Sequence, residues 1–403
     1  MPAARPNLHR PDDRFVPVRL DALVDAIDGD PGRFGPVAGW AQKLARSLER
    51  VIGLEANELH RHLDRLYAAM NPDLDTLPGH AAPDGTLHDA LCYLLGKANF
   101  TEMDDVGIKA ALAAGSVYGL RVKLDPEMIE RLSLHVRGRG FETHHRRHRV
   151  RPWRTSPFDV EVFPRLVVVA QIKGEDHLRL KLFRDIPMAD VEALLPHARV
   201  QMSVTDRLQI IGGGAGSLGG VAKVAAGGAV STTALAVPVA IGLGGLAIKS
   251  FLGYRRKKHQ RTSHRTQHLY DKNIANNAAV LHTLCRMIAQ EECKEALLAY
   301  AVLASGTTNA SCAGTLDKAV ERFLRDRFAL TLDFDGPDAC GTLRRLGLAA
   351  ADPLAAIRPE AALAALDELW RDRRTARHHV NSVANNFADG VGVRSADART
   401  ADQ

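Results

Sequence analysis

The chain has no Asp or Glu between Asp206 and Asp271, although acids make up 47 of its 403 residues. Residues 224–248 inside this gap carry no charge at all. A basic cluster follows them: Arg255, Arg256, Lys257, Lys258 and Arg261. Charge is costly inside a bilayer, and Lys and Arg anchor the cytoplasmic end of a membrane segment. We therefore predict that residues 209–254 form a helical membrane hairpin.

The two limbs of this hairpin differ in how well each would insert. Residues 234–253 hold nine strongly apolar side chains, which contribute roughly −4 to −5 kcal/mol to insertion. Residues 210–229 hold five, and Lys223 cancels them at about +3 kcal/mol. The first limb has a glycine at every fourth position, a spacing that lets helices approach closely: Gly212, Gly216 and Gly220. We expect this ridge to pack against the second limb, or against another copy of the chain.

The same glycines allow a second interpretation. Residues 214–219 match the GxGxxG pattern of a dinucleotide loop and follow the strand-like residues 207–211. That pattern also needs an acid about twenty residues later for the ribose, and none occurs before Asp271. A nucleotide or phosphate site in the loop 212–220 is therefore the alternative function, and a soluble pair of buried helices is the alternative structure.

Composition constrains the class of protein. The five Cys form no CxxC pair, which argues against a zinc ribbon or a disulfide framework. Residues 137–154 contain seven Arg against one Glu, so this strip could face anionic lipid or nucleic acid. Only Phe141 and Trp153 in the strip could stack on bases, so RNA is the weaker of these two expectations.

Hydrophobic periodicity predicts an α+β fold that is mostly helical. Residues 177–183 alternate apolar and polar after the turn at 174–176, which indicates a β-hairpin with residues 160–173. Three short helices and a small wing near residues 347–357 resemble a winged-helix unit. We expect five parts: an N-terminal helical region at 14–136, a basic segment with an α+β region at 137–208, the membrane hairpin at 209–254, a basic juxtamembrane helix and winged-helix-like module at 255–370, and a polar tail at 371–403.

Motifs of known chemistry are missing from the chain. It has no HExxH and no Walker loop, and we predict no catalytic, cofactor-binding or metal-binding residues. This favours a role other than catalysis without excluding an enzyme. Residues 291–370 contain eight Lys and Arg against thirteen Asp and Glu. DNA affinity depends on neutralising phosphates, so DNA is an unlikely partner for the C-terminal module and a protein is a better one.

Several segments resemble the family defined by domain of unknown function 3754, whose animal members are called transmembrane protein 143. The most distinctive is Phe183-Arg184-Asp185-Ile186-Pro187, which continues to Asp190. The other matching segments are residues 14–18, 66–73, 180–196, 249–254 and 292–300. The resemblance implies a membrane-associated protein, mitochondrial in animals, with no assigned reaction. The role of Phe183, Arg184, Asp185, Pro187 and Asp190 is unknown in such a family.

Together these observations predict a membrane-anchored scaffold or adaptor that recruits a protein partner at an anionic membrane surface. The membrane would be the bacterial inner membrane, or mitochondrial if the source is eukaryotic. Each residue of the basic cluster would add about 1 kcal/mol of attraction to anionic lipid.

Overall fold

The computed structural model describes residues 13–75, 86–104, 106–108, 110, 121–123, 128–147, 155–195, 199–201, 271–306, 313–350 and 355–375. The predicted membrane hairpin at 209–254 lies outside these residues. Within the described ranges, no helix is both long enough and apolar enough to cross a bilayer.

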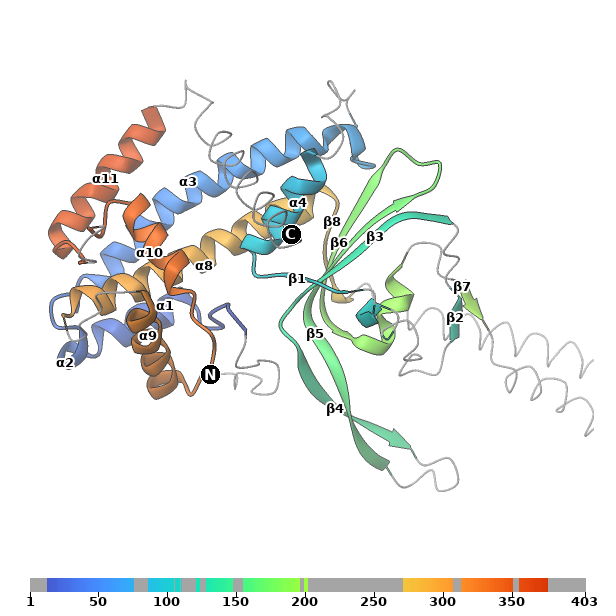
Figure 1. The fold of residues 1–403 in the computed structure, drawn as a ribbon, viewed down its shortest axis with the longest axis horizontal. Helices are drawn as coiled ribbons and strands as arrows, with labels where there is room; N and C mark the ends of the chain where they lie inside the picture. The colour runs from blue at the N-terminus through green and yellow to red at the C-terminus, as the bar shows by residue number, and fades with distance from the viewer. Residues whose placement is uncertain are drawn as a thin grey trace, which may run out of the picture.

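The chain folds into a helical half and an antiparallel sheet, and helix α8 runs from the sheet into the helices (Figure 1). The helices are α1 (Leu20–Asp28), α2 (Pro31–Phe34), α3 (Ala41–Tyr67), η2 (Ala68–Met70), α4 (Thr86–Lys97), η4 (Met188–Leu194), α8 (Ala278–Ala304), α9 (Ala313–Phe328), α10 (Gly336–Arg345) and α11 (Pro359–Thr375). The strands are β1 (Thr101–Glu102), β2 (Arg121–Lys123), β3 (Ile129–Arg137), β4 (Gly140–Arg147), β5 (Thr155–Ile172), β6 (Leu178–Pro187), β7 (Arg199–Gln201) and β8 (Asn273–Asn276).

The main sheet has the strand order β1-β3-β5-β6-β8, and β4 also pairs with β5. β3 and β4 lie along the same edge of β5 in one continuous register, since Arg137 faces Arg165 and Gly140 faces Val162. The bend between them is at Gly138, whose φ of +74° favours glycine. The β4 half of this long hairpin extends past the end of β6 as a two-stranded arm (Figure 1).

Each face of the sheet has its own core, because side chains alternate along β5 and β6. Val167, Val169 and Leu182 pack against α3, α4 and the start of α8. Leu166 and Val168 point the other way and pack against η4. A fully buried side chain of this kind contributes about 1.5 to 3 kcal/mol relative to exposure. Apolar packing on both faces therefore fixes the sheet between the helices and η4.

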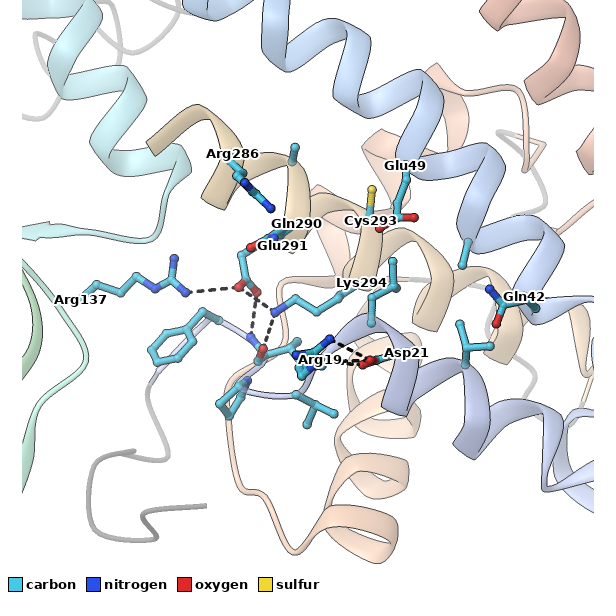
Figure 2. Close-up of a pocket in the computed structure, with 18 residues that line it drawn as sticks. Arg19, Asp21, Gln42, Glu49, Arg137, Arg286, Gln290, Glu291, Cys293 and Lys294 are labelled. Atoms are coloured by element: carbon cyan, nitrogen blue, oxygen red, sulfur yellow. Dashed lines mark hydrogen bonds and ion pairs between the residues drawn. The ribbon is translucent and has the colours of Figure 1, made fainter. Parts of the chain in front are cut away.

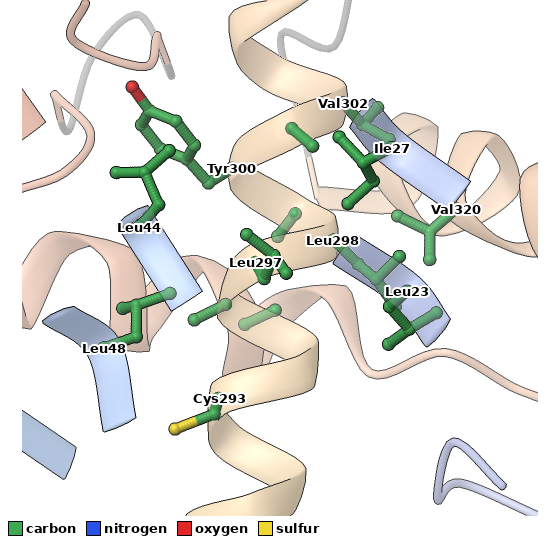
Figure 3. Packing of buried hydrophobic residues seen from close by; sticks show 14 of the residues in the cluster. Leu23, Ile27, Leu44, Leu48, Cys293, Leu297, Leu298, Tyr300, Val302 and Val320 are labelled. Carbon is green, nitrogen blue, oxygen red and sulfur yellow. The ribbon is translucent and has the colours of Figure 1, made fainter. Parts of the chain in front are cut away.

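The helical half is organised around the second part of α8. Leu297 and Leu298 have no exposed surface, and α1, α3 and α9 surround them (Figure 3). The core draws on residues 16–52 and on residues 293–366, which lie on opposite sides of the acid-free segment in the sequence. The two parts of the chain therefore form one folded body.

The α+β class and the hairpin over residues 160–183 are confirmed, within a larger sheet than expected. The N-terminal region 14–136 was expected to be helical; beyond Lys97 the described residues include the strands β1, β2 and β3 as well as a short helical stretch at 106–108. Residues 273–276 belong to the part in which a basic juxtamembrane helix was expected, and they form β8 instead, since they pair with the edge of β6. Residues 349 and 356 form a single bridge between α10 and α11, where a small wing was expected.

Candidate functional site

The candidate site is the point at which the chain returns from the acid-free segment to the sheet. We call it the root and define it as residues 183–187 together with residues 271–273. In β6 it contains the distinctive segment that begins at Phe183. The returning chain pairs with it directly, because Asn273 faces Phe183 and Ala275 faces Leu182.

Two side chains fasten the root, each reaching across to the other segment. Arg184 donates from Nη2 to the carbonyl oxygen of Asp271 at 3.1 Å. Lys272 donates from Nζ to the carbonyl oxygen of Asp185 at 2.5 Å. Hydrogen bonds from charged donors are worth about 1.5 to 3 kcal/mol. We call these two hydrogen bonds the clasp; Arg184 and Asp185 of the motif of unknown role take part in it.

Asp185 sets the local shape of the clasp. Its φ is +50°, a conformation that Asp and Asn tolerate better than other side chains. Side chains of β6 stop alternating between the two faces of the sheet at Asp185. Phe183 and Ile186, three residues apart, are therefore both buried in the core beneath η4. Pro187 then faces Val162 at the end of β6, and Asp190 is buried in η4. Four of the five motif residues therefore lie in the root, and Asp190 follows it in η4.

Charges around the root connect it to η4 and the arm. Burial lowers the pKa of Lys272, while Asp190, Glu142 and Asp185 act to raise it. Glu142 belongs to β4, so the base of the arm lies close to the clasp. Burial also lowers the pKa of Arg165, and Asp185 opposes that shift.

Removing the clasp should loosen β8 before it affects the rest of the sheet. We expect Lys272→Met to raise the hydrogen-exchange rate of the β8 amides about tenfold, equivalent to about 1.4 kcal/mol of local stability. The matched control is Lys173→Met, an exposed lysine beyond the far end of β5. Equal exchange rates in the two variants would show that the clasp carries no local stability.

A second feature, the buried charge cluster, lies on α8 beside the N-terminal segment (Figure 2). Glu291 accepts hydrogen bonds from Val16 N at 3.0 Å, Arg137 Nη2 at 3.2 Å and Lys294 Nζ at 2.7 Å. Lys294 also donates to the carbonyl oxygen of Val16. The guanidinium of Arg137 lies 4.4 Å from the ring centre of Phe15. The three charged residues are each less than 10% exposed.

A groove of about 760 Å³ opens beside this cluster, between α3, α8 and residues 15–21. Its rim carries Glu49 and Arg286, both exposed. Cys293 lies at its floor, and burial raises the pKa of the thiol well above the usual range. A neutral thiol is a poor nucleophile, so the groove is better suited to binding than to cysteine chemistry.

Further ion pairs join the helices that pack around α8. Glu55 of α3 forms ion pairs with Arg345 and Arg373, and Lys97 pairs with Asp338 at 2.7 Å. Glu295 of α8 is also buried, and Asp338 lies close enough to act on it. Burial raises its pKa to about 8, with Glu291 and Asp338 adding to the shift.

Several predicted site residues lie outside the described residues. They are Gly212, Gly216, Gly220, Arg255, Arg256, Lys257, Lys258 and Arg261. The loop at 212–220, proposed for a nucleotide, lies there too. Among the described residues, no group of three or more His, Cys, Asp or Glu could hold a metal ion.

Sequence reasoning missed the buried charge cluster. The signal was present, since Glu291, Lys294 and Glu295 precede the apolar residues 296–303 within one helix. A helix that is apolar on every side is buried. Charged residues that directly precede such a stretch in the same helix are therefore expected to be partly buried as well. The partners of these charges could not be identified, because Val16 and Arg137 lie far away in the chain.

Comparison with known families places the root inside a recognised region. Residues 156–279 match the family described as "Protein of unknown function (DUF3754)". The match runs from β5 to the start of α8, so it contains the clasp and the whole acid-free segment. No solved structure matches the chain.

Proposed function

This chain carries a region of the DUF3754 family, whose description assigns no function, and we propose that the protein is a membrane-anchored scaffold. In this proposal residues 209–254 insert into the bilayer as a hairpin, and the folded body recruits a protein partner at the membrane surface. The acid-free composition of the segment supports insertion.

The observation that carries the proposal is the shared core on both sides of the segment. Residues 16–52 pack with residues 293–366, and β6 pairs with β8. A single packed core cannot lie on both sides of a bilayer. If the segment enters the membrane, the chain must return to the face from which it left, as a hairpin does and a single span does not.

The dimensions of the segment agree with a hairpin. A helix needs about 20 residues to cross the hydrocarbon layer, and residues 209–254 offer two such lengths around residues 230–232. The clasp would hold the returning chain against the sheet after the basic cluster. The same glycine ridge could also pair two copies of the protein.

The folded body offers surfaces for a protein partner. Helices α9, α10 and α11 with the bridge between residues 349 and 356 support a winged-helix-like module. Its excess of acids disfavours DNA. In this proposal a protein partner with basic side chains docks on the module, at a bacterial inner membrane or a mitochondrial one.

Thiol labelling in sealed vesicles tests anchoring and topology together. One variant keeps Cys92, which is exposed and precedes the segment; the other combines Cys92→Ser with Lys318→Cys, exposed and after it. Both carry Cys312→Ser. We expect a membrane-impermeant maleimide to label both from the same face, and the protein to stay with the membranes through a carbonate wash.

Two results would count against the proposal in different ways. Release of the protein by carbonate would mean that the segment does not anchor it. Labelling of the two thiols from opposite faces would mean a single crossing, which contradicts the shared core.

A further inference from the structure

The groove beside the buried charge cluster has more buried positive than negative charge. Arg137 and Lys294 both line it, and the carboxylate of Glu291 lies between them (Figure 2). Glu295, one turn further along α8, also acts on both cations. Burial raises the pKa of Glu295 to about 8, so its carboxyl is mostly protonated at pH 7. The cluster therefore carries one positive charge that no carboxylate within it balances.

The other charged residues that line the groove cancel one another. Asp21 is exposed and forms an ion pair with Arg19 at 2.9 Å. Glu49 on α3 and Arg286 on α8 are exposed as well. The rim thus adds two acids and two cations, and it does not supply the negative charge that the cluster lacks.

Both buried cations keep N–H groups for a further acceptor. Of the three donors of its ammonium, Lys294 uses two among the described residues, on Val16 O and on Glu291. Of its five donors, Arg137 uses two in the same way, on Ala98 O and on Glu291. Burial lowers the pKa of both cations, while Glu291 opposes that shift. A second anion bound here would act in the same direction as Glu291.

The walls of the groove are partly apolar. Val18 in the N-terminal segment, Leu20 at the start of α1 and Ala289 on α8 all line it and are half-buried. The volume of about 760 Å³ lies within the range of roughly 300 to 1,000 Å³ that is usual for small-molecule sites. The groove therefore has room for an anion that carries a short hydrocarbon chain.

We propose that this groove binds a small organic monocarboxylate, whose carboxylate accepts hydrogen bonds from Arg137 and Lys294. Its apolar chain lies against Val18, Leu20 and Ala289. One unbalanced positive charge matches a monoanion better than a phosphate ester, which carries about −1.5 to −2 at pH 7. The site goes beyond the proposed scaffold and does not depend on it, because all of these residues belong to the folded body.

Titration calorimetry with three hexyl probes tests the charge requirement. The full-length protein in a non-ionic detergent is titrated at pH 7 with hexanoate, with neutral hexanamide and with hexyl phosphate. We expect hexanoate to bind at least about tenfold more tightly than hexanamide, because it gains charge-assisted hydrogen bonds. Equal affinities for these two probes would overturn the proposal. Tighter binding of hexyl phosphate than of hexanoate would overturn the choice of a carboxylate.

A variant of the apolar wall tests whether hexanoate binds in the groove. Ala289→Leu fills part of the space for the chain and should weaken hexanoate binding about tenfold. The matched control is Ala279→Leu, at an exposed position on the same helix that does not line the groove. Unchanged affinity in Ala289→Leu would mean that hexanoate binds elsewhere and that the proposal is wrong.

A variant of the rim tests the same point through charge. Arg286→Glu should weaken hexanoate binding about threefold, because an exposed cation beside the site becomes an acid. The matched control is Arg46→Glu, which changes the net charge equally at an exposed position of α3 outside the groove. Neither variant removes a buried hydrogen bond, so both should fold as the wild type does. Equal weakening in the two would show that affinity follows net charge alone, contrary to the proposal.

Discussion

Replacing Glu291 by Ala should lower the free energy of unfolding by about 3 to 5 kcal/mol. The carboxylate is buried and accepts hydrogen bonds from Arg137, Lys294 and the Val16 amide. Its removal leaves two buried cations and one amide without their partner. A buried charge stripped of its partner cannot recover the solvation that it lost on folding.

Urea unfolding followed by tryptophan fluorescence measures this change, since Trp40 and Trp370 pack against the helical core. The variant Glu291→Gln keeps an acceptor for the amide and should fall between Ala and the wild type. The matched control is Glu175→Ala, which removes a partly exposed ion pair with Arg179 and should cost about 1 kcal/mol. Equal losses in Glu291→Ala and the control would show that the cluster does not hold the N-terminal segment.

Replacing Glu295, one turn further along α8, should raise the free energy of unfolding instead of lowering it. Its pKa is raised to about 8 by burial and by neighbouring acids, among them Glu291. In the folded state the group therefore keeps its proton at pH values where the unfolded chain has lost it. The contribution of this group to the free energy of unfolding is fully present below its unfolded pKa of about 4.5. It is lost as the pH rises toward 8.

Glu295→Gln mimics the protonated carboxyl and should remove this loss. We expect the variant to be more stable than the wild type by up to about 3 kcal/mol at pH 7 and about 4 kcal/mol at pH 8. At pH 5 the difference should shrink to about 1 kcal/mol or less. Urea unfolding at the three pH values measures it; a constant difference would mean that another group causes the pH dependence.

The predicted elements that matched the structure depend on local pattern. The alternation of Leu178, Leu180 and Leu182 predicted β6 correctly, because one face of the strand is buried. The N-terminal region that was expected to be helical contains α3, whose buried residues recur at helical spacing. In both cases the spacing of apolar residues along the chain is sufficient to predict the secondary structure.

The errors occurred where a distant partner decides the conformation. Residues 273–276 have little strand character of their own, and they are extended because β6 offers an unpaired edge. The role of the motif at residues 183–190 was equally hidden. Its partners, Asp271 and Lys272, lie more than 80 positions further along the chain.

The sequence by itself determined where charge is tolerated: the acid-free segment, the basic cluster after it and the strand periods around it are all local properties. The tertiary structure alone decided that both ends of that segment belong to one body. That result depends on contacts such as the one between Val16 and Glu291, which are 275 positions apart. Such contacts form only when apolar surface from both halves is buried together, and the pattern of either half does not show it.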